Sequence, residues 1–411
     1  MSQASDARSA EVTRSQKSGA RPAEDERQAR LGLAAAGEPG DARLADLVTR
    51  HGAVELWRHL RRGPGQSALA RRAQTVDLPA LIDQTAALGQ RFVVPGDDEW
   101  PDRLGDLVRC SGVDSGGAPL GLWLAGPGRL DRLVEQAVAM VGARASTAYG
   151  EHIATDLAAG LAERGHGVVS GGAYGIDGAS HRAALAVGGA TLAIMAGGLG
   201  QLYPAGHIRL LERIRDEQVL VSEHPPDRRP SRSRFLARNR LIAALGLATV
   251  VVEGSVRSGA ANSARWALAL GRPVLAVPGP VTSATSATPH RLIRDQEAVL
   301  VATVEDVLEA ISPLDPARAV GPVQPSQWWD GLSEPERAVY EEIPGRGDIT
   351  VDELAERSGE TVVELIGRLS RLRERGLVQP TERGGWRLVR GGRAGTGLVA
   401  EEPKLGSSVE G

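Results

Sequence analysis

The stretch Gly167-Val-Val-Ser-Gly-Gly-Ala-Tyr-Gly-Ile-Asp177 joins a short apolar run to a glycine-rich loop and then to a helical pattern. A buried strand, a tight loop and a helix form the repeating unit of α/β proteins. The same order recurs on both sides of this stretch, from about residue 136 to residue 311. This region is therefore predicted to form an α/β sheet.

Seven apolar runs are predicted strands and six amphipathic stretches are predicted helices. The strands are Val138–Val141, Gly167–Val169, Thr191–Met195, Val219–Ser222, Thr249–Val252, Val274–Val277 and Val299–Val301. The helices are Tyr149–Glu163, Ile176–Val187, Ile208–Arg215, Phe235–Leu245, Ala261–Leu270 and Val304–Ile311. Strands that alternate with helices pair in parallel through crossovers, so we expect an extended Rossmann-like, doubly wound parallel sheet.

The flanks of this core have different compositions. Residues 1–40 contain few large aliphatic side chains and are predicted to be a disordered tail. Residues 41–95 show apolar residues at helical spacing and are predicted to form a small helical domain. The core is expected to span 96–311. Four prolines predict a linker over 312–326, and residues 391–411 are predicted to be a second disordered tail.

Residues 327–390 are predicted to form a winged helix. Three capping-box patterns, Ser333-x-x-Glu336, Thr350-x-x-Glu353 and Thr361-x-x-Glu364, each precede a helical stretch. Two apolar segments then flank Arg383-Gly-Gly385, which is a hairpin signal. Helices followed by a hairpin are the order of elements in a winged helix.

The composition excludes several classes of site. Among 411 residues there are two lysines, Lys17 and Lys404, so a P-loop, kinase or Schiff-base lysine within the core is excluded. Cys110 is the single cysteine, which excludes an intrachain disulfide or a cysteine-based zinc site. The net charge of −3 does not point to nucleic acid. The apolar stretch Leu241–Val252 is too short to span a bilayer, and no secretory signal is recognised, so a cytoplasmic location is expected.

The strand-to-helix loops of a parallel sheet meet at its carboxyl edge, where ligands bind. Six loops fall there: 142–147, 170–175, 196–200, 224–234, 253–259 and 278–280. Five of them carry glycine, which lets the backbone approach a ligand closely, and helix N-termini favour anions. The sixth holds the arginine run 228–234 and leads into Arg238-Asn-Arg240. The pattern predicts an extended anion site that suits a polyphosphate backbone.

The candidate ligand-contacting residues come from these loops. They are Gly142, Arg144, Ser170, Gly171, Gly172, Gly175, Gly197, Gly198, Arg238, Asn239, Arg240, Arg257, Ser258 and Gly259. Tyr174 and Tyr203 are candidates for stacking on bases, although Tyr203, which precedes Pro204, is also explained as a turn residue. For the run 228–234, a solvated surface explains the charges equally well. Phe235 is interpreted as a core residue.

Other constellations favour structural interpretations. Asp177 and His181 lie four apart on one helix face, which fits a metal pair or an acid–base couple. No third ligand lies nearby in the sequence, so a helix cap and an internal hydrogen bond explain them better. No nucleophile context is visible, and no catalytic residue, metal or cofactor is predicted. The loop 170–175 lacks a clean dinucleotide fingerprint and the acidic residue that would hold a ribose, which disfavours an NAD enzyme.

The same segments resemble the DNA-processing protein A (DprA/Smf) family. The motifs that carry this resemblance run in order through the core. They are Val141-Gly-Ala-Arg144, Val169-Ser-Gly-Gly-Ala-Tyr-Gly-Ile-Asp177 with Ala179 and His181, Gly197-Gly-Leu-Gly200 with Tyr203-Pro204, Leu220-Val-Ser-Glu-His-Pro-Pro226, Phe235 with Arg238-Asn-Arg-Leu-Ile-Ala243, Val252-Glu-Gly254, Arg257-Ser-Gly-Ala260, Ala276-Val-Pro-Gly279 and Arg291-Leu-Ile-Arg-Asp295.

The resemblance implies a non-enzymatic protein that binds single-stranded DNA during DNA uptake and transformation. It implies a homodimer that loads the RecA recombinase onto strands covered by single-strand-binding protein, without membrane insertion. Arg144 and Arg238-Asn-Arg240 match the phosphate-gripping motifs, and the N-terminal helices match a sterile-α-motif-like domain. Tyr174 replaces an arginine that is usual in the family, His290 replaces an asparagine, and the lysine common after the Tyr-Pro turn is missing.

Two other functions are alternatives for this sequence. A nucleotide-cleaving phosphoribohydrolase would carry a Pro-Gly-Gly-x-Gly-Thr loop, whereas Ala196-Gly-Gly-Leu-Gly-Gln201 lacks the proline and the threonine. A winged-helix regulator of duplex DNA would read a groove with its second helix. That helix mixes Arg368, Arg371, Arg373 and Arg375 with Glu364 and Glu374, which makes it a weak reader.

Overall fold

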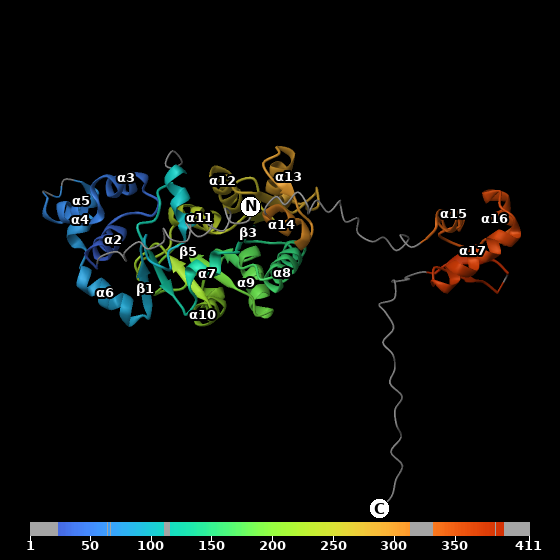
Figure 1. Cartoon of the computed structure of the whole chain (residues 1–411), viewed down its shortest axis with the longest axis horizontal. Helices are drawn as coiled ribbons and strands as arrows, with labels where there is room; N and C mark the ends of the chain where they lie inside the picture. Colours follow the sequence, from blue (N-terminus) through green and yellow to red (C-terminus); the bar gives the residue numbers. More distant parts are fainter. Residues whose placement is uncertain are drawn as a thin grey trace, which may run out of the picture. The chain divides into compact units, whose positions relative to one another are not determined.

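The computed structural model describes residues 24–312 and 332–389, apart from residues 64, 66, 111–115 and 383. The chain divides into two compact units, residues 1–313 and residues 314–411. The first unit contains the sheet and the N-terminal helices, and the second contains three helices and a hairpin (Figure 1). Each unit is described by itself.

A nine-stranded sheet with the order β1-β2-β6-β5-β4-β3-β7-β8-β9 forms the centre of the first unit. Its strands are β1 (Gln90–Val93), β2 (Leu122–Ala125), β3 (Val138–Val141), β4 (Val168–Ser170), β5 (Thr191–Met195), β6 (Val219–Ser222), β7 (Thr249–Val251), β8 (Val274–Ala276) and β9 (Val299–Leu300). Strands β3 to β9 pair in parallel, as predicted. The chain leaves β3 toward β4 and later returns to β7 on its other side, so a topological switch point lies at β3.

At one edge the sheet continues beyond the seven predicted strands, with two further strands that pair antiparallel. Strands β1 and β2 pair antiparallel with each other, and β2 pairs antiparallel with β6. Polar and apolar residues do not alternate along β2, because all of its residues are buried. Trp123 of β2 is fully buried, with its ring 4.5 Å from that of Phe92 on β1. This pairing joins segments about 30 to 100 residues apart, which local pattern does not report.

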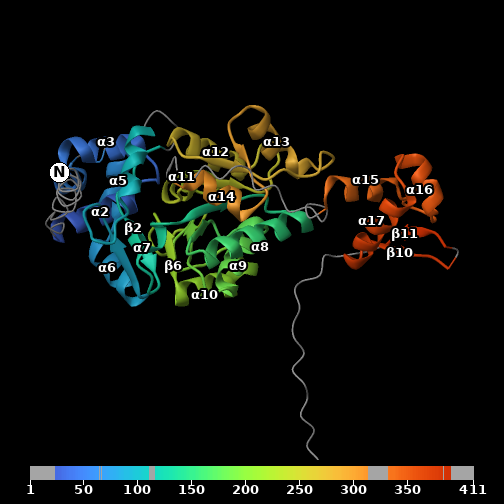
Figure 2. The ribbon, with the colours of Figure 1, turned by 45° about the vertical axis from the view of Figure 1, so that its right-hand side comes forward.

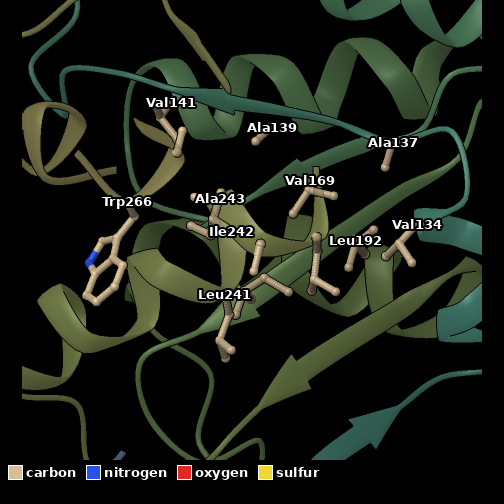
Figure 3. Packing of buried hydrophobic residues seen from close by; sticks show 14 of the residues in the cluster. Val134, Ala137, Ala139, Val141, Val169, Leu192, Leu241, Ile242, Ala243 and Trp266 are labelled. Carbon is tan, nitrogen blue, oxygen red and sulfur yellow. The ribbon is translucent and has the colours of Figure 1, made fainter. Parts of the chain in front are cut away.

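Helices cover both faces of the sheet (Figures 1 and 2). Alternate residues of β3 divide between the two sides: Ala139 and Val141 belong to one buried cluster, and Val138 and Met140 to the other. The first cluster packs against α11 (Arg232–Leu245) and α12 (Gly259–Ala269), and Figure 3 shows its strand residues beside those of α11. The second packs against α8 (Ala148–Glu163), α9 (Ile176–Ala186) and α14 (Val304–Ile311). The remaining elements between β1 and β9 are η1 (Asp102–Cys110), α7 (Leu130–Val134), η2 (Ala205–His207), α10 (Ile208–Glu217), η3 (Ala284–Ser286) and α13 (Ala287–Arg294).

The N-terminal helices are α2 (Glu24–Ala36), α3 (Ala42–His51), α4 (Ala53–Arg62), α5 (Ala68–Thr75) and α6 (Leu78–Ala87). The prediction of disorder over residues 1–40 was wrong for α2. Leu31 joins the cluster around Phe92 and Trp123, and Leu33 packs with α3 to α5. Arg27 also donates two 2.7 Å hydrogen bonds to the carboxylate of Asp97. Helix α2 is therefore stabilised by contacts with segments outside residues 1–40, and the composition of residues 1–40 does not indicate those contacts. Residues 1–23 lie outside the described part.

The second unit has α15 (Glu334–Glu342), α16 (Val351–Ser358), α17 (Val362–Glu374), β10 (Val378–Pro380) and β11 (Trp386–Leu388). All three predicted capping boxes are present. The antiparallel strands β10 and β11 form the hairpin. The hydrophobic core of the second unit includes Leu354, Leu365 and Val378. This is the helix and hairpin content predicted for a winged helix. The predicted linker beyond residue 312 and the tail 391–411 lie outside the described residues.

We expect the second unit to lose stability as the pH falls from about 4.5 to about 2. Glu336 accepts hydrogen bonds from the Ser333 N–H (2.9 Å), from Arg371 (2.6 Å) and from the Ser333 hydroxyl (2.9 Å), which lower its pKa from 4.5 to about 2. A depressed carboxyl pKa stabilises the folded state above the unfolded pKa, and protonation removes that contribution. Thermal unfolding of the full chain, followed by NMR amide signals of α15 to α17, measures the effect.

Two Glu→Gln variants of α15 test this prediction, one at Glu336 and a matched control at Glu341. Glu336→Gln is expected to reduce the pH dependence. Glu341→Gln, which removes an exposed partner of Arg337, is expected to leave it unchanged. An unaltered pH dependence in Glu336→Gln would contradict the prediction.

Candidate nucleic-acid interface

A cavity of about 760 Å³ lies at the carboxyl edge of the sheet, beside the switch point at β3. Four of the six predicted loops contribute to its lining: 142–147, 170–175, 224–234 and 253–259. The loop 196–200 lines a smaller hollow that shares Tyr203, Pro230 and Phe235 with the main cavity. The loop 278–280 does not line either space. A cavity therefore lies at the sheet edge where the sequence predicts an anion site, and four of the six loops contribute to its lining.

Arg144 stands on the loop that follows β3. Gly142 precedes it, and a Cβ at Gly142 would clash with Ile176 of α9, so the close contact between loop and helix requires glycine. The Arg144 side chain is exposed, and its guanidinium carbon lies 4.5 Å from the ring centre of Phe235. This cation–π contact holds a positive charge at the cavity wall. Arg257 and Ser258 line the cavity from the loop after β7, and Arg257 is exposed.

Arg238 supplies a second charge from within the protein. It is 6 % exposed, and its Nη1 donates hydrogen bonds to the carbonyls of Gly171 (2.8 Å) and Ile194. A side chain at Gly171 would occupy the position of the guanidinium. Burial lowers the pKa of Arg238 to about 10, with Asp177 opposing the shift, so the side chain stays charged at neutral pH. Its Nε has no hydrogen-bond partner among the described residues, and Arg238 lines the cavity.

Asp177 and His181 belong to the supporting structure. Asp177 is buried in the first turn of α9 and accepts a hydrogen bond from the Ala173 N–H (3.3 Å). Burial raises its pKa, and Arg238 opposes the rise. His181 is fully buried with Nδ1 2.7 Å from the Thr191 hydroxyl, and burial lowers its pKa to about 3. The described residues contain no cluster of three or more His, Cys, Asp or Glu side chains that could hold a metal.

The aromatic wall differs from the prediction. Phe235, interpreted from the sequence as core, lies in the cavity lining, with its ring centre 6.0 Å from that of Tyr203. Tyr203 is half exposed in the same lining. Tyr174 does not line the cavity; its hydroxyl accepts a hydrogen bond from Gly206 N–H (3.0 Å), and its ring meets His207 edge-on. The position of Phe235 near the start of the arginine-bearing helix, beside the cavity loops, is the sequence feature that indicates this place.

Arg240, which the sequence predicted to contact DNA, is buried outside the cavity lining. Its side chain is fully buried and forms a two-pronged ion pair with Glu223, with N–O distances of 2.6 and 2.7 Å. Its Nε donates to the Gly117 carbonyl at 2.9 Å. Side chains two positions apart on an α-helix point about 200° away from each other, so Arg238 and Arg240 face different surroundings. Asn239 does line the cavity and donates to Asn262 Oδ1 (3.1 Å).

Several glycine-loop residues predicted to contact a ligand form internal hydrogen bonds or tight turns. The Gly198 N–H donates to the Arg228 carbonyl (2.7 Å), so it is not available to a ligand. Ser170 is fully buried and donates to the Met140 carbonyl (2.6 Å). Gly172 and Gly175 have φ of 66° and 73°, which explains why glycine stands there. The predicted residues that the main cavity brings together are Gly142, Arg144, Tyr203, Arg238, Asn239, Arg257, Ser258 and Gly259. Those that it leaves out are Ser170, Gly171, Gly172, Tyr174, Gly175, Gly197, Gly198 and Arg240.

The arginine run 228–234 divides between two roles. Arg228 donates to the Ala35 carbonyl of α2 (2.9 Å), and Arg234 pairs with Glu38 (3.0 Å). Arg229 and Arg232 are exposed, and Arg232 lines the cavity. Arg228 and Arg234 therefore bind residues at the end of α2 and just after it, and Arg232 places a charge at the cavity.

Helix α17, which carries the arginines considered above for duplex DNA and is the third described helix of the second unit, is poorly suited to reading a groove. Arg368 pairs with Glu360, and Arg371 pairs with Glu336. Val363 and Ile366 are exposed at its N-terminal half, where a recognition helix contacts base edges. Side chains of this kind offer few hydrogen bonds to a groove. The geometry of this unit does not favour the duplex-regulator interpretation.

Comparisons with known proteins find similarity over the core of this chain and beyond it. The family model for DNA recombination-mediator protein A matches residues 91–312. The putative DNA processing protein DprA of Mycobacterium tuberculosis is 48 % identical over 370 residues, which cover 88 % of this chain and 94 % of that protein. Protein Smf of Escherichia coli is 37 % identical over 272 residues, covering 64 % and 71 %. The X-ray structure of DNA processing protein A from Streptococcus pneumoniae superimposes with a TM-score of 0.59 and 30 % identity, covering 69 % of this chain and 97 % of that one. The chain belongs to the DNA recombination-mediator protein A (DprA/Smf) family.

Proposed function

We propose that this chain binds single-stranded DNA in the cavity at β3 and acts there as a recombination mediator. The observation that carries the proposal is the convergence of Arg144, Arg238 and Arg257 on one cavity with Phe235 and Tyr203 in its wall. Arginines along a groove neutralise a phosphate backbone, and aromatic rings stack on unpaired bases. A duplex does not offer its base faces in this way, so the arrangement favours a single strand.

The partners of this activity are part of the same proposal. The bound strand is protected and passed to a RecA recombinase on DNA covered by single-strand-binding protein, in DNA uptake and transformation. The active form is a cytoplasmic homodimer. Family membership supports this, and within residues 24–312 and 332–389 no helix has the length and hydrophobicity needed to cross a bilayer.

The role is one of binding rather than catalysis. A phosphoribohydrolase would need its glycine loop open to a nucleotide, whereas Gly198 and Gly200 donate their N–H groups to the carbonyls of Arg228 and Pro226. The buried Asp177 and His181 take part in internal hydrogen bonds. Release of free base from a nucleoside monophosphate by the purified chain would contradict this part of the proposal.

The test is fluorescence anisotropy of a labelled oligonucleotide and of the matching duplex over a salt series. We expect tighter binding of the single strand and an affinity that falls steeply as salt rises. The slope of log affinity against log salt concentration should steepen by about 0.7 for each phosphate contact. Equal binding of the duplex, or affinity independent of salt, would refute the proposed function. The matched duplex controls for charge alone.

A further inference from the structure

A buried carboxylate lies directly behind the loop that carries Arg144. Glu253, two residues after β7, is 3 % exposed. Its Oε2 accepts a hydrogen bond from the Thr147 N–H (3.0 Å). Its Oε1 accepts hydrogen bonds from the hydroxyls of Thr147 (2.6 Å) and Thr285 (3.0 Å). One side chain therefore joins the end of β7, the Arg144 loop and the segment around η3.

The loop is anchored at both ends. At its start, the Ile176 N–H donates to the Ala143 carbonyl (3.2 Å). At its end, Thr147 caps α8 by accepting from the Gly150 N–H (3.1 Å), while Glu253 holds its backbone and its hydroxyl. A Cβ at Gly150 would clash with this carboxylate, so the helix leaves room for it. Arg144 lies between the two anchors.

The negative charge of Glu253 has two opposite effects on the binding of an anion at the Arg144 loop. A carboxylate behind an anion-binding loop repels the ligand and by itself weakens binding. The two hydrogen bonds from Thr147 act in the opposite direction, because they restrict the loop from which Arg144 reaches the cavity, and the bond from Thr285 holds the carboxylate in place. Burial strengthens both effects, so the net result depends on which of the two is larger.

We propose that Glu253 is a positioning residue that holds Arg144 toward the cavity, and that this outweighs its repulsion of the ligand. The inference rests on the proposed binding of single-stranded DNA in the cavity. It assigns a role in DNA binding to a residue that does not line the cavity and carries the same charge as the ligand.

The first test is Glu253→Ala in the full chain, with a fluorescent oligothymidine as the probe. Positioning predicts affinity about tenfold weaker and a salt slope lower by about 0.7, the same changes as in Arg144→Ala. A purely electrostatic role predicts tighter binding, which would overturn the proposal. Asp156→Ala is the matched control: it removes an exposed carboxylate from α8 without touching the loop, and unchanged binding is expected.

A double-mutant cycle separates positioning from general destabilisation. If Glu253 acts through Arg144, Glu253→Ala in the Arg144→Ala background costs no more than about a further twofold. A further tenfold loss in that background would overturn the proposal. Glu253→Gln keeps the shape and an accepting oxygen, and is expected to bind within about twofold of the parent.

Thr147→Val provides the same test if Glu253→Ala fails to fold, because Thr147 does not line the cavity. It removes the hydroxyl that donates to Glu253 and caps α8, and is expected to weaken binding by about threefold, whereas Thr147→Ser keeps the hydroxyl and is expected to bind as the parent does. Equal binding by Thr147→Val and the parent would contradict positioning. If Arg144→Ala itself binds as tightly as the parent, the proposed DNA site is wrong. If Arg144→Ala loses affinity and Glu253→Ala does not, the positioning role alone is wrong.

Discussion

Arg240→Ala is expected to lower the free energy of unfolding of the first unit by about 3–5 kcal/mol. The Arg240 guanidinium is fully buried and forms two hydrogen bonds with Glu223, which is 8 % exposed. Removing the arginine leaves a buried carboxylate without its counter-charge, and it also leaves the Gly117 carbonyl without its donor. Chemical denaturation of the full chain, followed by far-ultraviolet circular dichroism, measures the change.

Two variants control for this stability prediction. Arg234→Ala lies on the same helix but breaks a pair with Glu38, whose side chain is 50 % exposed, so a loss below about 1 kcal/mol is expected. Glu223→Leu/Arg240→Met removes both charges and is expected to recover part of the stability lost in Arg240→Ala. A loss of less than about 1 kcal/mol in Arg240→Ala would contradict the structural role given to the pair.

Arg144→Ala/Arg257→Ala is expected to weaken binding of single-stranded DNA by at least about 100-fold, since each charge-assisted phosphate contact contributes roughly 1.5–3 kcal/mol. Both side chains are exposed and line the cavity, so stability should change by less than about 0.5 kcal/mol. Loss of two contacts should lower the logarithmic salt slope by about 1.4. Anisotropy titrations over a salt series measure both quantities.

The matched control for this affinity prediction is Arg213→Ala/Arg215→Ala on α10. It removes the same number of arginines from a helix that does not line the cavity. Its affinity should fall only slightly, through the change in net charge. If the two double variants bound equally well, the cavity would not be the DNA site. A variant that also removed Arg240 would not serve this purpose, because lost folding would be confused with lost binding.

The alternation of strands and helices between residues 136 and 311 was predictable because apolar periodicity is local. Strands β3, β5 and β6 have the predicted bounds, and α14 does too. Arg144 and Arg257 were predictable as cavity residues because parallel strands end at one edge, and the loops after them must meet there. The three capping boxes of the second unit were predictable for the same reason: cap and helix lie within four residues.

Tertiary packing decided the rest. Helix α2 forms because Leu31 and Leu33 are buried by segments distant in the sequence, and β2 adds to the sheet by pairing with β6, about 100 residues away. Arg238 and Arg240 are two residues apart in one motif, yet one lines the cavity and the other pairs with Glu223. Residue type and spacing predict which charges approach the sheet edge. Only the packing of α11 against its neighbours determines which charge stays open to a ligand, because burial and counter-charge come from other parts of the chain.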